Sequence, residues 1–161
     1  MQKTQRPETS PRAERVEAVR TLLFEGRFGT LSTLSTKPEG FPFGSLVPFA
    51  QGSRGEPLLL LSGLAQHTRN LKADPRASLL VLAPGADDPM QAARASLIGR
   101  AVEIGGADAE DGRARFLQRH PRAAAWFALD FALWRIDVSE VRFVGGFGQA
   151  AWVSGSEVLG S

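Results

Sequence analysis

The chain has 161 residues, 43% of them hydrophobic and 22% charged, which is enough for one compact domain with a sizeable core. It contains no cysteine and only two histidines, so disulfides, thiolate chemistry and the usual zinc sites are excluded, and no metal is expected. The basic and acidic residues are nearly balanced and scattered, and no apolar run could cross a membrane, so neither nucleic acid nor a bilayer is an expected partner. The N-terminus lacks the apolar core of a secretory signal, and we expect a cytoplasmic protein.

The first half of the chain predicts a helix, a hairpin and a third strand. Ser10-Pro11 is a typical helix start, and Gly26 is a typical helix end. The alternating residues 28–35 and 41–50 predict two strands joined by a turn that contains proline and glycine. The leucine-rich residues 57–62 predict a third strand, which follows a second glycine-rich turn.

The second half predicts short helices set among further strands. The expected helices cover residues 65–73, 108–119 and 122–129, with a break at His120-Pro121. The expected strands cover residues 77–83, 96–104, 131–138 and 141–147, with a bulge or bend at Gly99. Strands that follow one another as hairpins favour an antiparallel barrel over a doubly wound sheet. We therefore predict a mainly β (α+β) fold, an antiparallel split β-barrel of six or seven strands with short peripheral helices.

A dense block of hydrogen-bonding side chains directly follows the third strand. It runs from Ser62 to Asn70 and opens the expected helix at residues 65–73. The free N–H groups and the dipole at a helix start, together with hydroxyl, imidazole and guanidinium groups, suit a phosphate. In the plainer alternative, Ser62 only caps the helix and the other side chains are solvated surface. Spacing alone leaves these two interpretations even.

Four sequence blocks, taken together, carry a resemblance to a known family. They are residues 40–48, residues 62–71 with 74–78, His120-Pro121 and residues 144–150. In these blocks the chain resembles the FMN-binding split-barrel superfamily typified by pyridoxamine 5′-phosphate oxidase, and it is most similar to the haem-utilisation (HugZ-type) branch. The resemblance covers residues 14–153, which we take as the FMN-binding domain. Residues 1–13 and 154–161 are then expected to be a disordered N-terminal tail and a C-terminal tail.

The resemblance implies a homodimer that holds FMN at the subunit interface and acts on a small molecule. The phosphate and ribityl chain would contact one set of residues from the second strand and one from the polar block, namely Phe43, Gly44, Ser45, Leu46 and Val47, and Ser62, His67, Thr68, Arg69 and Asn70. Phe147 and Gly148 would border the cofactor from the partner subunit. Late aromatic residues are expected in the core or at the dimer interface, namely Trp126, Phe127, Phe131, Trp134 and Trp152.

The chain departs from both branches of the superfamily. Pyridoxamine phosphate oxidases carry an arginine in the second strand, where this chain has Ser45, and an Arg-Lys pair before the short helix, where it has His67, Thr68 and Arg69. The C-terminal substrate-binding tail of the oxidases and the further C-terminal domain of the haem-utilisation branch are both lacking. These departures argue against vitamin B6 oxidation and against haem degradation.

The first expectation for function is an FMN-dependent oxidoreductase. No catalytic residue is assigned, because a flavin performs the redox chemistry itself. The alternative is a non-catalytic flavin- or haem-binding protein that serves haem utilisation, storage or delivery, and an oxidative haem-processing enzyme comes third. In the flavin interpretation His67 is a cation beside the phosphate, and in the haem interpretation it is a candidate iron ligand. His120 is expected to be a structural cap or a surface residue.

Overall fold

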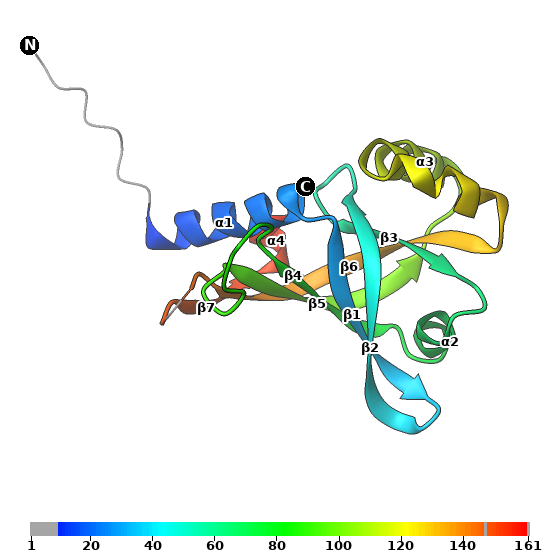
Figure 1. Ribbon diagram of the computed structural model, residues 1–161, viewed down its shortest axis with the longest axis horizontal. Helices are drawn as coiled ribbons and strands as arrows, with labels where there is room; N and C mark the ends of the chain where they lie inside the picture. The colour runs from blue at the N-terminus through cyan, green and yellow to red at the C-terminus, as the bar shows by residue number, and fades with distance from the viewer. Residues whose placement is uncertain (1–9, 147, 161) are drawn as a thin grey trace, which may run out of the picture.

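The computed structural model describes residues 10–146 and 148–160, and Figure 1 shows one strongly curved sheet with helices along its margins. The strands are β1 (Phe28–Thr36), β2 (Glu39–Gln51), β3 (Pro57–Ser62), β4 (Arg76–Leu82), β5 (Arg94–Glu103), β6 (Phe131–Val144) and β7 (Ala150–Ser154). The helices are α1 (Pro11–Glu25), α2 (Gln66–Ala73), α3 (Gly106–Arg119), the 3-10 helix η1 (Pro121–Ala128) and α4 (Gly155–Val158).

The sheet closes on itself. All its strands pair antiparallel in the order β3-β2-β1-β4-β5-β6-β7, and β3 also pairs with the first half of β6, from Leu58 opposite Arg135 to Ser62 opposite Phe131. This pairing makes a ring of six strands, with β7 added outside it along the second half of β6. The predicted antiparallel split barrel is therefore confirmed.

The run of leucines in β3 is buried on both faces of the strand. Leu59 and Leu61 belong to the core inside the barrel, whereas Leu58 and Leu60 pack outside it in a second cluster with Phe116. That second cluster lies where α3 and η1 cover the sheet. A strand covered on both faces reads as a continuous apolar run rather than as an alternating one. The sequence of β3 therefore reflects its position between two layers.

The late strands differ from the prediction. Residues 131–144 form one long strand instead of two, and the register between β5 and β6 shifts between Ile98 and Gly99, where Ser139 is the extra residue on the β6 side. A Cβ atom at Gly99 would lie 2.1 Å from the carbonyl oxygen of Asp137, so the close approach of β5 and β6 requires a glycine here. β7 was not predicted, and residue 147, the predicted end of the last strand, lies outside the described residues.

The residues predicted as tails are ordered wherever the structure describes them. Residues 11–13 form the first turn of α1, and residues 155–158 form α4, so the predicted boundaries at residues 14 and 153 are too narrow. The rest of the predicted tails, residues 1–9 and 161, lies outside the described part of the chain. Among the described residues, no helix combines the length and the apolar character needed to span a membrane.

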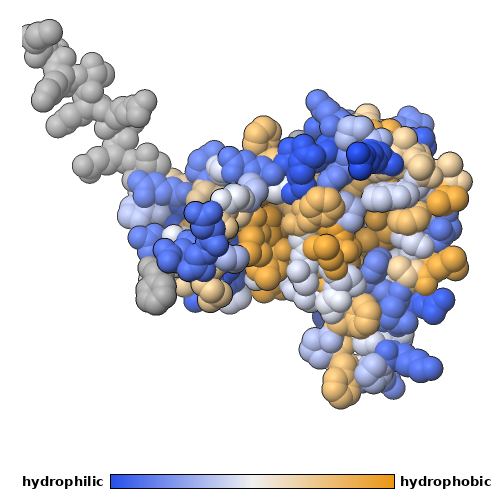
Figure 2. Space-filling model, in the orientation of Figure 1, coloured by the Kyte–Doolittle hydropathy of each residue, from blue (hydrophilic) through white to orange (hydrophobic). Residues whose placement is uncertain are grey.

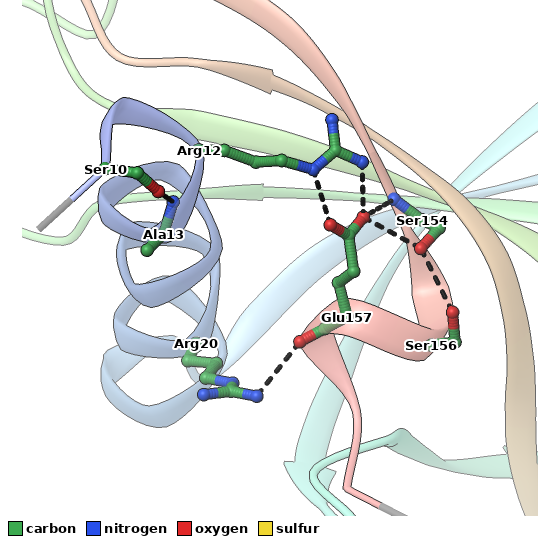
Figure 3. A network of polar contacts seen from close by, with 7 residues as sticks. All are labelled: Ser10, Arg12, Ala13, Arg20, Ser154, Ser156 and Glu157. Atoms are coloured by element: carbon green, nitrogen blue, oxygen red, sulfur yellow. Dashed lines mark hydrogen bonds and ion pairs between the residues drawn. The ribbon is translucent and has the colours of Figure 1, made fainter.

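Four side chains tie the two ends of the domain together, and we call them the terminal clamp: Arg12, Arg20, Ser154 and Glu157. Arg12 donates to both carboxylate oxygens of Glu157, at 2.5 and 2.7 Å, as Figure 3 shows. The same carboxylate accepts from the backbone N–H and the hydroxyl of Ser154. Arg20 donates to the last carbonyl oxygens of α4. The Arg12 contact and the Ser154 hydrogen bonds lower the pKa of Glu157 to about 2.

Candidate functional site

The candidate site lies where β3 ends and α2 begins. We call it the α2 edge and define it by Ser45, Ser62, Leu64, His67 and Asp130. Ser62 is the last residue of β3, and Asp130 directly precedes β6, whose first residue is paired with Ser62. Ser45 lies on β2 and His67 in the first turn of α2. The closing pair of strands therefore brings residues from distant parts of the chain to one end of the barrel.

Asn70 fixes α2 onto β1. Its side chain is fully buried, and its carbonyl oxygen accepts from the backbone N–H of Thr36 at 3.0 Å and from the side chain of Gln66 at 2.8 Å. Its amide group donates to the hydroxyl of Thr33 at 2.9 Å. These partners occupy both ends of the amide, so Asn70 holds the helix in place from beneath.

Thr68 is buried like Asn70, and it too is bonded inside the chain. Its hydroxyl donates to the carbonyl oxygen of Ser62 at 2.6 Å, and the side chain is only 2% exposed. Ser62 does not cap the helix, because the N-cap position of α2 is Ala65, which has no side-chain acceptor. The Ser62 hydroxyl accepts instead from the backbone N–H of Leu64. The plainer alternative for Ser62, helix capping, is therefore wrong.

Asp130 is a carboxylate that the sequence analysis did not single out. Its Oδ2 accepts from the Ser62 hydroxyl at 2.7 Å and from the backbone N–H of Leu64 at 3.2 Å. The hydrogen bond from Ser62 is the main reason that the pKa of Asp130 is lowered, so this carboxylate stays ionised at neutral pH. Asp130 thus places a negative charge at the α2 edge.

His67 has one engaged and one orphaned ring nitrogen. Nδ1 lies 3.2 Å from the hydroxyl of Ser45, whereas Nε2 is buried with no hydrogen-bond partner among the described residues. Burial lowers the pKa of His67, so the ring is neutral near pH 7. A neutral imidazole with one free nitrogen is able to bind a metal ion, whereas the expected role of His67 as the positive charge beside a phosphate requires the ring to take up a proton.

Apolar side chains surround these polar groups. Leu64 and Leu129 are 73% and 65% exposed; the N–H of Leu64 donates to Asp130, and Leu129 directly precedes Asp130. Trp126 stacks on Phe131, with ring centroids 5.7 Å apart and planes inclined by 16°. Trp126 and Phe131 therefore form an aromatic platform at the start of β6. Exposed leucines beside such a platform mark a ligand or partner surface more than a random surface does.

The structure gathers only some of the predicted site residues. Ser45, Ser62 and His67 meet at the α2 edge, with Arg69 exposed on the outer side of the helix. Phe43 lies on the same face of β2 as Ser45, whereas the pleat directs Gly44 and Leu46 to the opposite face. The side chain of Val47 is in the core, so only its backbone is open to a ligand.

The remaining predicted contacts lie elsewhere or outside the described residues. Gly148 follows the far end of β6, at the opposite end of that strand from Asp130, and one chain does not bring it to the α2 edge. Phe147 lies outside the described residues. The roles of all these residues in binding a cofactor stay predictions. His120, in contrast, donates from Nε2 to the carbonyl oxygen of Phe49 at 2.8 Å and packs on Phe116, as expected of a structural residue.

Comparison with known proteins places the chain in a family. The family model described as "CREG, beta-barrel" matches residues 10–159. The non-canonical haem oxygenase HOZ of Arabidopsis thaliana, named as chloroplastic, is 40% identical over 150 residues, which cover 92% of this chain and 46% of HOZ. The haem oxygenase HutZ of Vibrio cholerae is 29% identical over 81% of this chain and 77% of HutZ. A solved haem-binding protein from Mycobacterium smegmatis has a TM-score of 0.84 at 35% identity, covering 96% of this chain and 61% of that protein.

These comparisons change the balance between the expected functions. All three relatives are named for haem and none of the three for FMN, so the findings favour the haem-binding alternative over the FMN-dependent oxidoreductase that we expected first. Two of them are named as oxygenases, which weakens the argument against haem processing. This chain spans about half the length of HOZ. The resemblance to the pyridoxamine 5′-phosphate oxidase-like split barrels is confirmed, and the chain belongs to the CREG-type β-barrel family.

Proposed function

We propose that this chain is a haem-binding protein and that the α2 edge holds the haem. The observation that carries the proposal is the 40% identity, over nearly the whole chain, to a haem oxygenase. The chemistry of the α2 edge supports it, because haem needs a flat apolar surface, cations for its two carboxylates and, in many proteins, an imidazole for iron. The α2 edge supplies the imidazole of His67, Arg69 of the same helix supplies a cation, and the stacked Trp126 and Phe131 supply a flat apolar surface.

The chain offers one group for each part of the haem. Leu64, Leu129 and the Trp126–Phe131 platform would contact the macrocycle, and Arg69 on the outer side of α2 would face the carboxylates. His67 is the candidate iron ligand, since it supplies a neutral nitrogen without a partner. Because Nε2 is buried, the ring has to rotate before it can reach iron, and this rotation breaks the contact with Ser45.

A haemin titration tests this proposal. We expect the purified protein to bind haemin with a sharp Soret band, His67→Ala to weaken binding at least tenfold and change the band, and His120→Ala to bind as the wild type does. His120 is the matched control because it is the other histidine and lies away from the α2 edge. No Soret shift in the wild type, or an unchanged spectrum in His67→Ala, would contradict the assignment of haem or of its ligand, respectively.

FMN remains a competing ligand, supported by the likeness to the pyridoxamine 5′-phosphate oxidase-like fold. A flavin-dependent oxidoreductase would give a yellow protein that bleaches on addition of NADH or NADPH. The absorbance spectrum of the native protein and the mass of whatever heating releases distinguish the two ligands. Flavin bands together with an absent response to haemin would reverse our order of preference.

We further propose that the chain forms a homodimer through the outer face of its sheet. One register row crosses six strands on this face, from Leu46 through Thr30, Leu80, Ser96 and Arg142 to Trp152. The outer face of a half-buried sheet is normally polar, yet Leu46 is 77% and Trp152 is 52% exposed. Figure 2 shows hydrophobic side chains gathered over β1, β2 and β4. An apolar surface of this kind supports association with a second copy.

Light scattering at micromolar concentration tests the homodimer. We expect a dimer for the wild type and a monomer for Leu46→Glu, because a charge within the contact would be buried without a partner. Phe24→Glu is the matched control, since Phe24 is 71% exposed on α1, away from the sheet face, and should leave the dimer intact. A monomeric wild type, or a dimeric Leu46→Glu, would overturn the assignment.

Oxidative haem cleavage is the second candidate function, supported by the names of two relatives. Haem-loaded protein supplied with ascorbate in air, with catalase present to remove free peroxide, should lose its Soret band and release iron in proportion. Asp130→Asn should slow this loss if the Asp130 carboxylate positions water or a proton donor near the haem. A Soret band that persists under these conditions would show that the protein binds haem without cleaving it.

A further inference from the structure

We propose that a second, separate site binds a small molecule through a carboxylate or phosphate group. It is a hollow of about 710 Å³ between α1, α4, β6 and the turn that joins β2 to β3. Three arginines from three different elements line it: Arg20 of α1, Arg54 of the turn and Arg135 of β6. Asp137 is the only acidic residue among the described residues that line it, so arginines outnumber carboxylates in the lining.

Arg54 is the central residue of this site. Its backbone is fixed on both sides, because its N–H donates to the buried carboxylate of Glu56 at 2.9 Å and its carbonyl oxygen accepts from the N–H of Gly160 at 2.8 Å. Its guanidinium group makes no hydrogen bond or ion pair within the described part of the chain. Arg54 also lines two adjoining hollows, so its side chain borders a wide concave surface. An arginine whose backbone is fixed and whose donors are free among the described residues is suited to a bidentate oxyanion contact.

The other two arginines are already held in position. Arg20 donates from Nε to the carbonyl oxygen of Val158 and from its second nitrogen to that of Glu157, both at 2.9 Å, and Figure 3 shows it reaching from α1 to α4. Arg135 donates to Asp137 at 2.8 Å and lies 3.6 Å from Asp108. Arg20 also lies 3.5 Å from the carboxylate of Glu17, and the two carboxylates beside Arg135 offset its charge. Among the described residues, Arg54 therefore provides both the unpaired positive charge and the free donors.

The hollow also has an apolar side. Val138 and Leu159 line it beside the glycines at residues 155 and 160. Its size and mixed lining fit a small organic anion better than a bare ion, because a ligand of this kind would bury carbon atoms against these two side chains. The hollow adjoins the turn before β3, whereas the α2 edge follows the end of β3. A ligand here would therefore not touch the residues that we assign to haem.

An NMR titration at constant ionic strength tests this site, with citrate and inorganic phosphate as probes. We expect saturable shifts of the Gly155 and Gly160 amides, and tighter binding of citrate if the apolar wall contributes. Arg54→Gln should weaken binding roughly tenfold, as expected for the loss of a charge-assisted contact. The affinity of Arg54→Lys should lie between those of the wild type and Arg54→Gln. Arg69→Gln, which removes an exposed arginine from α2, should bind both probes as the wild type does.

Several results would overturn the proposal. Shifts that rise linearly without saturation, that spread over the whole surface, or that persist unchanged in Arg54→Gln would mean general attraction to a basic protein instead of a site. A haemin titration of Arg54→Gln should match that of the wild type. If this variant loses haem binding and phosphate binding together, the two sites are not separate and the inference is wrong, whereas failure of haem binding in the wild type leaves it unaffected.

Discussion

The terminal clamp and the α2 edge are both built from polar side chains, but they use them in opposite ways. In the clamp, Glu157 is bonded to Arg12 and Ser154, and each group completes the other. At the α2 edge, Nε2 of His67 has no partner in the described part of the chain, and Leu64 is open to solvent. Polar groups that hydrogen-bond to one another stabilise the fold, whereas buried polar groups without a partner cost stability. Unpaired groups beside exposed apolar surface are typical of functional sites.

The contrast also runs within α2 itself. Asn70 and Thr68 are buried and have their partners inside the chain, whereas Arg69 is exposed and His67 is half-buried, with Nε2 unpaired among the described residues. The first two residues hold the helix in place, so that the other two are presented in a fixed position. We expect the two sides of α2 to respond differently to substitution, and the clamp to respond differently from both.

The largest effect is expected from Gly155→Ala, between the clamp residues Ser154 and Glu157. A Cβ atom at this position would lie 2.0 Å from the carbonyl oxygen of Val138, so the backbone of α4 has to move away from β6. We expect a loss of about 3 kcal/mol in the free energy of unfolding, measured by urea denaturation. Gly105→Ala is the control, since a Cβ atom there would meet nothing within 4 Å. An equal loss in both variants would show that the close approach is not the cause.

Asn70→Ala should come next. It leaves the backbone N–H of Thr36 and the hydroxyl of Thr33 without their buried partner, which is expected to cost about 2 kcal/mol of unfolding free energy. Arg69→Ala, one residue earlier and exposed, should change stability by less than about 0.5 kcal/mol. If the two variants were equally stable, the division of α2 into an anchoring and a presenting side would be wrong.

The contribution of the clamp to the free energy of unfolding should depend on pH. The pKa of Glu157 is about 2 in the folded chain, below its ordinary value of 4.5, so its contribution to stability is complete above pH 4.5 and is lost as the pH falls towards 2. Glu157→Gln should therefore be less stable than the wild type at pH 6, and the difference should vanish near pH 2. Urea denaturation at several pH values measures it. Asp74 also titrates near pH 2, but it does so in both proteins and cancels from the difference.

The α2 edge should give a smaller effect of its own on acidification. Burial lowers the pKa of His67 below its ordinary value of 6.5, so the unfolded chain takes up a proton more readily than the folded chain as the pH falls below 6.5. Stability should decline there, and the decline should be shallower in His67→Gln. A pH dependence identical to that of the wild type would mean that the ring is not buried as the structure has it.

Prediction from sequence succeeded where the signal is local. The capped start of α1 at Ser10, the hairpin of β1 and β2, and the bulge at Gly99 are each encoded within a few residues, and all are confirmed. The contact of Ser62 with Asp130 joins residues 68 positions apart and exists only because β3 pairs with β6. No local sequence pattern links these two residues, which is why Asp130 was missed.

The amino-acid sequence by itself determined an antiparallel barrel with a polar block at the end of its third strand, because alternation, turns and helix caps act between near neighbours. The tertiary structure decided which side chains of that block are free. It buried Thr68 and Asn70, and it left Nε2 of His67 without a hydrogen-bond partner among the described residues. It also placed Arg54, unpaired among those residues, at the edge of a separate hollow. Those outcomes depend on which strand closes the barrel and which helix covers it, and the free energy of burial that settles this choice is summed over the whole core.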